Sequence, residues 1–171
     1  GASDLLTLRA ARLLGQADVV FHDALIAADV LALARTATKI PVGKRSGRHS
    51  TAQRFINKRL ADAARSHRVV VRLKGGDPML FGRAHEEITY LTSRGVRVEV
   101  VPGVTAAVAA SADLAISLTR RGAARSVVLV TPRVGKGERE SRWVASVIAA
   151  DTAAIYMGAG EAEAIAAALI G

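Results

Sequence analysis

The sequence predicts an α/β fold in which mostly parallel strands alternate with helices. Short apolar runs of the strand type are separated by segments with apolar residues at helical spacing. The runs are continuously apolar, as in Val69-Val70-Val71, which is typical of parallel strands buried on both faces. The 171 residues, 50% of them hydrophobic, supply enough apolar material for one or two domains.

The start of the chain predicts two helices and two strands in alternation. Residues 5–15 place leucines at helical spacing, and Gly15 is a usual helix stop. Residues 17–23 (ADVVFHD) predict a short buried strand that ends at an aspartate. A helix over residues 26–35 and a strand over residues 38–42 (TKIPV) follow.

The middle of the chain predicts a long helix, the most apolar strand and a shorter helix. Ser50 and Gln53 match the capping box that begins a helix, so residues 51–66 are expected to be helical. The residues predicted to share one face of this helix are Phe55, Ile56, Leu60 and Ala63. Residues 68–74 (RVVVRLK) predict a strand, and a helix is expected over residues 83–94.

A Pro-Gly pair suggests a boundary between two domains. Residues 96–101 (VRVEVV) predict a strand, and Pro102-Gly103 follows it, so we expect domains over residues 1–103 and 104–171. The second domain is expected to contain helices near residues 104–113, 141–150 and 161–170, and strands at 126–131 and 152–157. The chain begins on a helix without a preceding strand and ends directly after a helix, at Ile170-Gly171. We therefore expect material to be missing at both ends and the second domain to be incomplete.

Composition excludes several classes of protein. There is no cysteine, which excludes disulfides and thiolate chemistry and makes a cytoplasmic setting the default. No run approaches the roughly 18 apolar residues of a membrane helix, so no membrane association is expected. The four histidines lack the spacing of metal ligands, and no metal site is predicted.

The net charge of +9 is compatible with two interpretations. It is either a solvated basic surface or the mark of an anionic partner, which would be nucleic acid or a small polyanion. Aromatic residues make up only 4% of the chain, which argues against the stacking platforms of single-strand binders. A basic module that binds nucleic acid is therefore the less favoured alternative.

Five loops follow predicted strands. In open parallel sheets ligands bind beyond the carboxyl ends of the strands, so these loops are expected to face one rim or a cleft shared by two sheets. They begin at Asp23, Gly43 (GKRSGRH), Gly75 (GGDPMLFG), Pro102 (PGVTAA) and Tyr156 (YMGAG). This convergence is stronger evidence for a site than any single motif.

Three of these loops are compatible with both a structural and a functional interpretation. Gly75 and Gly76 either form a tight turn with Asp77 as a cap, or leave the backbone bare for a ligand that Asp77 helps to hold. The pair Lys44-Arg45 is either a solvated turn, or an anion contact and proton donor. Asp23 is either a helix N-cap or a functional carboxylate.

Taken together, the loops resemble a known family. The segments VGKRSGRHS, VVRLKGGDPMLFGRAHEE, VEVVPGVTAA, LTRRG and AIYMG occur in the order and rough spacing of the uroporphyrinogen-III C-methyltransferases. That family belongs to the tetrapyrrole methylase superfamily, and its domain also forms part of sirohaem synthase. The resemblance covers nearly the whole chain, but departs from the family pattern at Ala84-His85.

The resemblance implies two α/β domains with a cleft between them, usually in a homodimer. It implies that S-adenosyl-L-methionine methylates C2 and C7 of uroporphyrinogen III to give precorrin-2, with S-adenosyl-L-homocysteine as the other product. A methylase of a later precorrin intermediate is the alternative within the superfamily. Neither function involves nucleic acid.

The resemblance also implies roles for individual residues. The residues implied to bind the cofactor are Gly75, Gly76, Asp77, Leu80, Thr105, Ala106 and Met157. Asp23 matches the proposed proton acceptor, and Lys44 matches the proposed proton donor. Because guanidinium groups pair well with carboxylates, the substrate carboxylates are expected to meet Arg45, Arg83, Arg120 and Arg121.

Overall fold

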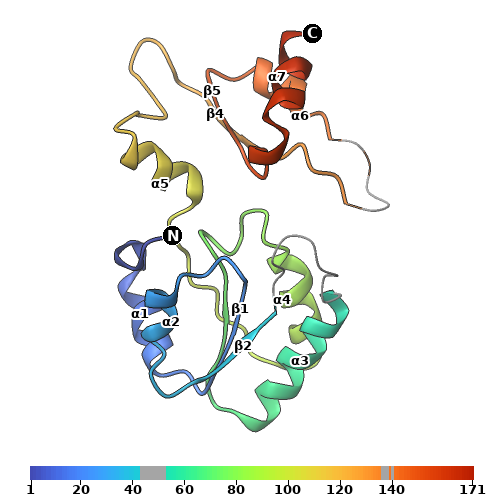
Figure 1. Ribbon diagram of the computed structural model, residues 1–171. Coiled ribbons are helices and arrows are strands. Elements are labelled where there is room, and N and C mark those ends of the chain that lie inside the picture. The colour runs from blue at the N-terminus through green and yellow to red at the C-terminus, as the bar shows by residue number, and fades with distance from the viewer. Residues whose placement is uncertain (43–52, 136–138, 140) are drawn as a thin grey trace. The chain divides into compact units, whose positions relative to one another are not determined.

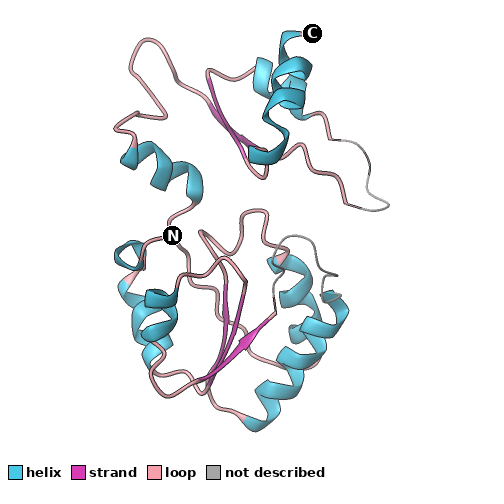
Figure 2. Cartoon of the chain, viewed as in Figure 1, coloured by secondary structure: helices cyan, strands magenta, loops and turns pink. Residues whose placement is uncertain are grey.

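The structure, a computed structural model, describes residues 1–42, 53–135, 139 and 141–171 (Figure 1). It divides into two compact units, Gly1–Ala106 and Ala107–Gly171, each of which contains helices and parallel strands (Figure 2). The predicted α/β class is therefore confirmed. The division falls three residues after the predicted boundary.

Unit 1 is built on a three-stranded parallel sheet. Its strands are β1 (Val19–His22), β2 (Thr38–Pro41) and β3 (Val70–Leu73), in the order β2-β1-β3. Both pairings are parallel and run in register from the first residue of each strand. The carboxyl ends of all three strands therefore meet at one edge, where the loops after β1 and β3 begin.

Helices cover both faces of this sheet (Figure 1). The short η1 (Ser3–Leu5), α1 (Leu8–Gly15) and α2 (Ala28–Ala32) lie on one side, whereas α3 (Gln53–Ser66) and α4 (Ala84–Thr92) lie on the other. Because successive residues of a strand point to opposite faces, β1 contributes to both cores. Val20 belongs to the cluster beneath α1 and α2, and Phe21 to the cluster beneath α3.

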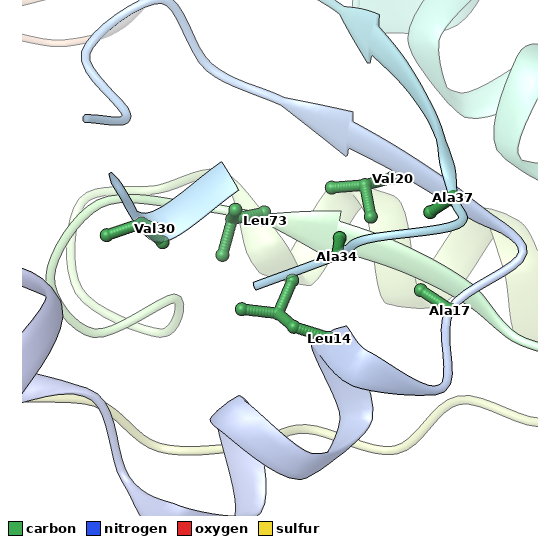
Figure 3. Close-up of a cluster of buried hydrophobic side chains, with 7 residues drawn as sticks. All are labelled: Leu14, Ala17, Val20, Val30, Ala34, Ala37 and Leu73. Atoms are coloured by element: carbon green, nitrogen blue, oxygen red, sulfur yellow. The ribbon is translucent and has the colours of Figure 1, made fainter. Parts of the chain in front are cut away.

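The first cluster is drawn in Figure 3. It joins Leu14, Ala17, Val20, Val30, Ala34, Ala37 and Leu73. Three of these seven residues are alanines and none is aromatic, in line with the aromatic-poor composition of the chain. The apolar strands of this unit were predictable, because a sheet covered on both faces requires apolar residues at consecutive positions.

Two expectations about unit 1 were wrong in detail. The first helix begins at Leu8 instead of residue 5, because the Thr7 hydroxyl caps it by accepting a hydrogen bond from Ala10 N at 3.2 Å. Phe55 does not share the buried face of α3: it is 51% exposed, whereas Ile56 is 5% exposed. The Arg59 guanidinium instead lies 5.8 Å from the centre of the Phe55 ring.

The strand expected over residues 96–101 is not formed. In the described part of the chain these residues make no ladder with the sheet of unit 1, and Arg97, Glu99 and Val100 are exposed. A strand needs a partner for its backbone groups, and alternating apolar residues alone do not supply one. The segment instead runs without regular secondary structure into residues 103–106.

Unit 2 has a two-stranded parallel sheet of β4 (Val127–Val130) and β5 (Thr152–Ile155). Its other elements are α5 (Ala106–Asp113), α6 (Trp143–Ile148), η2 (Ala159–Glu161) and α7 (Ala162–Ile170). Among the residues described in this unit, Val130 is the only buried hydrophobic one, at 9% exposure. Unit 2 therefore has much less of a core than unit 1.

In both units, an aspartate carboxylate accepts hydrogen bonds from backbone N–H groups at the amino ends of the strands. The Asp18 carboxylate accepts hydrogen bonds from the two backbone N–H groups ahead of β3, at 2.9 and 2.8 Å. The Asp151 carboxylate accepts bonds from the two N–H groups ahead of β4, both at 2.9 Å, and from the Ser126 hydroxyl at 2.8 Å. These backbone hydrogen bonds lower the pKa of each carboxyl.

No helix in the described ranges is both long and apolar enough to cross a membrane.

Candidate functional site

The loop after β3 is shaped by one carboxylate. Asp77 Oδ1 accepts a hydrogen bond from Met79 N at 2.8 Å, and Asp77 Oδ2 accepts one from Gly103 N at 3.0 Å. The first bond closes a tight turn and the second ties the loop to the segment that precedes α5. The structural interpretation of Asp77 thus describes its contacts in this structure, and its predicted role as a cofactor ligand stays a prediction.

Glycines allow this loop and that segment to lie against each other. A Cβ added at Gly103 would lie 2.4 Å from the carbonyl oxygen of Gly76, so no side chain fits there. Gly76 has a φ of +69°, and a Cβ on it would lie 3.7 Å from Thr105 Cα and Ala106 N. The backbones at these predicted cofactor positions are therefore brought together.

Gly75 differs from its neighbours. A Cβ added to it would meet no atom of the described residues within 4 Å, and its φ is outside the left-handed region. Neither the packing nor the backbone of that part of the protein therefore requires glycine at this position. A bare backbone facing open space fits a site where a ligand lies close to the chain.

The remainder of the loop presents apolar side chains. Leu80 is half-buried, whereas Met79 and Phe81 are exposed, and they are the candidates for a wall against a flat ring. Phe81 and Arg83 have φ values of 52° and 55°, in the left-handed region that residues other than glycine rarely adopt. Such strain is typical of functional loops that the surrounding structure holds in place.

Asp23 follows β1 and lies next to the start of this loop. Its Oδ1 is 2.6 Å from Arg72 Nη2 on the adjacent strand. The N-cap residue of α2 is Ala27, so the interpretation of Asp23 as a helix cap was wrong. Its carboxylate instead belongs to a group of charged side chains.

Those charged side chains centre on Glu87, which is buried on α4. Its Oε1 is 3.1 Å from Arg72 Nε, and its Oε2 is 3.0 Å from Lys74 Nζ. The amide of Gln53 donates to Oε1 at 3.0 Å. Lys74 Nζ also donates a hydrogen bond to the carbonyl of Gly82. This hydrogen bond joins the two ends of the loop that lies between these residues.

Sequence reasoning missed this arrangement, although a signal was present. Arg72 and Lys74 alternate within an otherwise apolar strand, so two cations on one face of a buried sheet require a buried anion. Glu86 and Glu87 are about 100° apart on the helix, so only one of them can face inward. The structure shows that Glu87 does so, while Glu86 is exposed.

Not all the predicted site residues are brought together. Lys44 and Arg45 lie outside the described residues. Arg83 forms an exposed ion pair with Glu86, with Nε–Oε1 and Nη2–Oε2 distances of 2.6 and 2.7 Å, and it lowers the pKa of that carboxyl. The predictions for these residues stay predictions.

Three predicted residues belong to unit 2. Arg120 and Arg121 are exposed, and Arg120 N donates to the Ala124 carbonyl at 2.8 Å in a tight turn. Met157 follows β5, is exposed and has a left-handed φ of 59°. Its side chain lies at the carboxyl end of its own sheet, which is where such a site would be expected in an α/β unit.

Comparison with known proteins gives consistent matches. The sequence profile of the family described as Tetrapyrrole (Corrin/Porphyrin) Methylases matches residues 1–170. A siroheme synthase of Psychrobacter sp. (strain PRwf-1) is 47% identical over 159 residues, which are 92% of this chain and 33% of that protein. The chloroplastic S-adenosyl-L-methionine-dependent uroporphyrinogen III methyltransferase of Arabidopsis thaliana is 45% identical over 94% of this chain and 44% of that protein.

Solved structures show the same likeness. A uroporphyrin-III C-methyl transferase from Thermus thermophilus complexed with S-adenyl homocysteine matches with a TM-score of 0.83 and 42% identity, over 98% of this chain and 70% of that one. A cobalt precorrin-4 methyltransferase matches with a TM-score of 0.81 and 26% identity, over 99% and 70% of the two chains. The chain spans about a third of the length of the siroheme synthases it matches.

Proposed function

Because the chain belongs to the tetrapyrrole methylase family, we propose that it is the methylase part of an S-adenosyl-L-methionine-dependent uroporphyrinogen III C-methyltransferase. The observation that carries this proposal is the likeness to the Thermus thermophilus enzyme with its bound S-adenyl homocysteine, which extends over nearly the whole chain. The resemblance carried by five segments of the sequence points to the same family.

The loop after β3 fits the proposed cofactor. Gly75 faces open space, and Gly76, Thr105 and Ala106 bring two backbone segments together beside it. Asp77 holds those segments in place through hydrogen bonds to each. We therefore assign the cofactor contact of unit 1 to the backbone near Gly75, with Leu80 beside it, and the shape of the loop to Asp77.

S-Adenosyl-L-methionine supplies a methyl group on a sulfonium, so a carbon–sulfur bond breaks as the new carbon–carbon bond to a pyrrole carbon forms. Such an in-line displacement depends mainly on holding the two reactants in position. The protein residues assigned above bind and orient, and none of them needs to form a covalent bond.

Methylation adds a carbon substituent to the ring system, and a proton must then leave the macrocycle. A carboxylate near the ring accepts that proton as a general base, and Asp23 is the candidate. Its side chain is 34% exposed, so it is open at the carboxyl end of β1. Lys44 is the corresponding candidate for a proton donor.

The finer statement of the reaction is that C2 and C7 are methylated to give precorrin-2. The substrate carries several carboxylates, which would suit the basic chain and the candidate arginines Arg45, Arg83, Arg120 and Arg121. Arg83 already pairs with Glu86, so a substrate carboxylate would have to compete for its guanidinium group. A homodimer is the assembly that we propose from the family resemblance.

A methylase of a later precorrin intermediate is the second candidate. The likeness to a cobalt precorrin-4 methyltransferase favours it, because the TM-score of 0.81 is close to that for the uroporphyrin-III enzyme. The lower sequence identity, 26% against 42%, makes it the less favoured of the two.

The direct test is to incubate the full-length protein with uroporphyrinogen III and S-adenosyl-L-methionine and to analyse the products by mass spectrometry. Products with one and two added methyl groups are expected, together with S-adenosyl-L-homocysteine. Normal binding of S-adenosyl-L-homocysteine without turnover of uroporphyrinogen III would contradict the proposal and favour a later precorrin substrate. Absence of S-adenosyl-L-homocysteine binding would contradict both candidates.

A further inference from the structure

The Asp23 carboxylate is held by an arginine that is itself held by a second carboxylate. Arg72 Nη2 lies 2.6 Å from Asp23 Oδ1, and Arg72 Nε lies 3.1 Å from Glu87 Oε1. The two contacts use different nitrogens of one guanidinium. Because that group is planar and its donors have fixed directions, its orientation at one carboxylate determines its orientation at the other.

The two ends of this chain of contacts differ in exposure. The Glu87 side chain is 6% exposed, whereas that of Asp23 is 34% exposed. Throughout the described residues, every buried side-chain nitrogen and oxygen has a hydrogen-bond partner. The buried end is therefore fully paired, while the outer end is open to solvent beyond the carboxyl end of β1.

A helix, a strand and the end of a strand position the side chains of Glu87, Arg72 and Asp23, respectively. Arg72 is within β3, Glu87 is on α4, and Asp23 follows the last residue of the central strand β1. Catalytic groups need to be held within a fraction of an ångström of their working position, which supporting side chains on such elements achieve. Asp23 lies at the start of a loop, so the contact with Arg72 supplies a support that its own backbone does not.

We propose that Arg72 is a positioning residue that acts through Asp23, and that Glu87 is the anchor that orients Arg72. The inference rests on the proposed function, in which Asp23 accepts the proton that leaves the macrocycle. The proposal adds Arg72 and Glu87 to the mechanism as residues that act without touching the substrate. With Lys74 included, the group contains two cations and two anions, so its formal charges balance when Asp23 is counted among the anions.

Lys74 provides a matched control for Arg72. Both cations come from the same strand or its end, and both pair with Glu87, but through different oxygens. Lys74 makes its second contact with the carbonyl of Gly82, and within the described ranges it forms no ion pair with Asp23. A purely structural role for the charged group would make the two cations equivalent.

The test is a double-mutant cycle on the full-length enzyme, with kcat and KM for uroporphyrinogen III as readouts. We expect Arg72→Met to lower kcat on the order of 10- to 100-fold, as misplaced general bases do, with a smaller change in KM. In the Asp23→Asn background the same substitution should change kcat less than about twofold, because its effect passes through the missing carboxylate. Lys74→Met should instead lower kcat by the same factor in both backgrounds.

Two further variants separate positioning from folding. Arg72→Lys keeps the charge but cannot span both carboxylates, so it should recover less than half of the lost kcat. Glu87→Gln should lower kcat in the same direction as Arg72→Met. Thermal unfolding and the Kd for S-adenosyl-L-homocysteine, measured on every variant, show whether each one is folded.

The proposal is overturned if folded Arg72→Met keeps kcat within about twofold of the parent chain, or if its loss multiplies with that of Asp23→Asn. An inactive parent chain would instead refute the proposed function. A crystal structure of Arg72→Met then decides the positioning claim: a displaced Asp23 carboxylate supports it, and an unmoved one overturns it.

Discussion

Glycine occupies both position 75, at the start of the loop after β3, and position 103, in the segment that packs against it. The physical reasons for a glycine differ between the two positions. Gly103 is required by the protein, because a Cβ there would overlap the Gly76 carbonyl oxygen. A Cβ on Gly75 would meet no atom of the described residues within 4 Å, so their packing does not require glycine there. Packing explains the glycine at position 103, and a ligand contact is the reason that we propose for the glycine at position 75.

Replacing Gly75 by alanine tests this distinction. The free energy of unfolding should be unchanged or slightly higher, since the new residue restricts the unfolded chain and meets no described atom in the folded one. The Kd for S-adenosyl-L-homocysteine should rise by an amount equivalent to about 1–3 kcal/mol, because the added methyl group occupies ligand space. Calorimetric titration and chemical denaturation measure the two quantities.

Gly15→Ala is the matched control for this experiment. Gly15 also has no described atom within 4 Å of an added Cβ and a φ outside the left-handed region, but it ends α1, away from the loop sequence. Its substitution should leave the affinity unchanged. Equal affinities for the parent chain and Gly75→Ala would remove Gly75 from the cofactor site.

Asp77 shows how far the sequence determines such a site. One of the two interpretations that the sequence left open, a tight turn closed by Asp77, agrees with the hydrogen bond from Met79 N. The sequence did not reveal that the second carboxylate oxygen would bind Gly103 N, 26 residues further along the chain. A contact over that distance depends on how the elements pack, which local patterns do not encode.

At the scale of elements, strands were predicted well and exact helix faces less well. Consecutive apolar residues identified β1, β3, β4 and β5. Burial on both faces explains this pattern for the central strand β1, in which Val19, Val20 and Phe21 are all buried. The expected strand over residues 96–101 did not form, because a strand also needs a second segment that pairs with it, and these residues pair with no strand of the described sheet. Pairing is a property of two segments, and the sequence of one does not specify it.

Neighbouring residues on α3 give a sharp test of the observed helix face. Ile56→Ala should lower the free energy of unfolding by about 2–5 kcal/mol, because it leaves a cavity in the cluster beneath the helix. Phe55→Ala should lower it clearly less, because the ring is half exposed and the Arg59 guanidinium lies over it at 5.8 Å from its centre. Urea denaturation of both variants measures the difference, and the reverse order would show that Phe55 faces the core.

The strand-end carboxylates predict a dependence of stability on acid. The pKa of Asp18 is lowered in the folded state, mainly by its hydrogen bond from Val69 N. Its stabilising effect is therefore present above its unfolded pKa of about 3.8 and is lost as the pH falls through the lower folded pKa. Asp18→Asn should be less stable than the parent chain at neutral pH, and the difference should shrink as the pH falls below 3.8.

Denaturation at a series of pH values measures this effect. Asp62→Asn is a suitable control, because Asp62 is exposed on α3 and, among the described residues, its carboxylate pairs only with the exposed side chain of Arg65. Its free energy of unfolding should follow that of the parent chain across the series. A constant difference between Asp18→Asn and the parent chain at every pH would contradict the assignment.

At the scale of the whole molecule, the core is unevenly distributed. Unit 1 buries two hydrophobic clusters against its sheet, whereas among the described residues of unit 2 only Val130 is a buried hydrophobic one. Burial of apolar surface is the largest favourable contribution to the free energy of folding. Unit 1 is therefore expected to be the more stable unit of this 171-residue chain.

Hydrogen exchange of the chain should show this difference. The backbone amides of β1 and β3 should be the slowest to exchange, and those of β4 and β5 should exchange at least about tenfold faster, in proportion to the weaker local core. Mass spectrometry of peptides from each strand measures the rates. Equal protection in the two sheets would show that the units unfold together as one cooperative structure.

The positions of the carboxylates Asp18 and Asp151 have a consequence for the evolution of this fold. Each one fixes the alignment of its strands from the amino end, whereas the candidate contacts in both units follow the opposite end. Mutations that lengthen, shorten or replace a loop there do not touch the bonds that set the alignment. Loops that bind different substrates can therefore evolve while the hydrogen bonds that align the strands are retained.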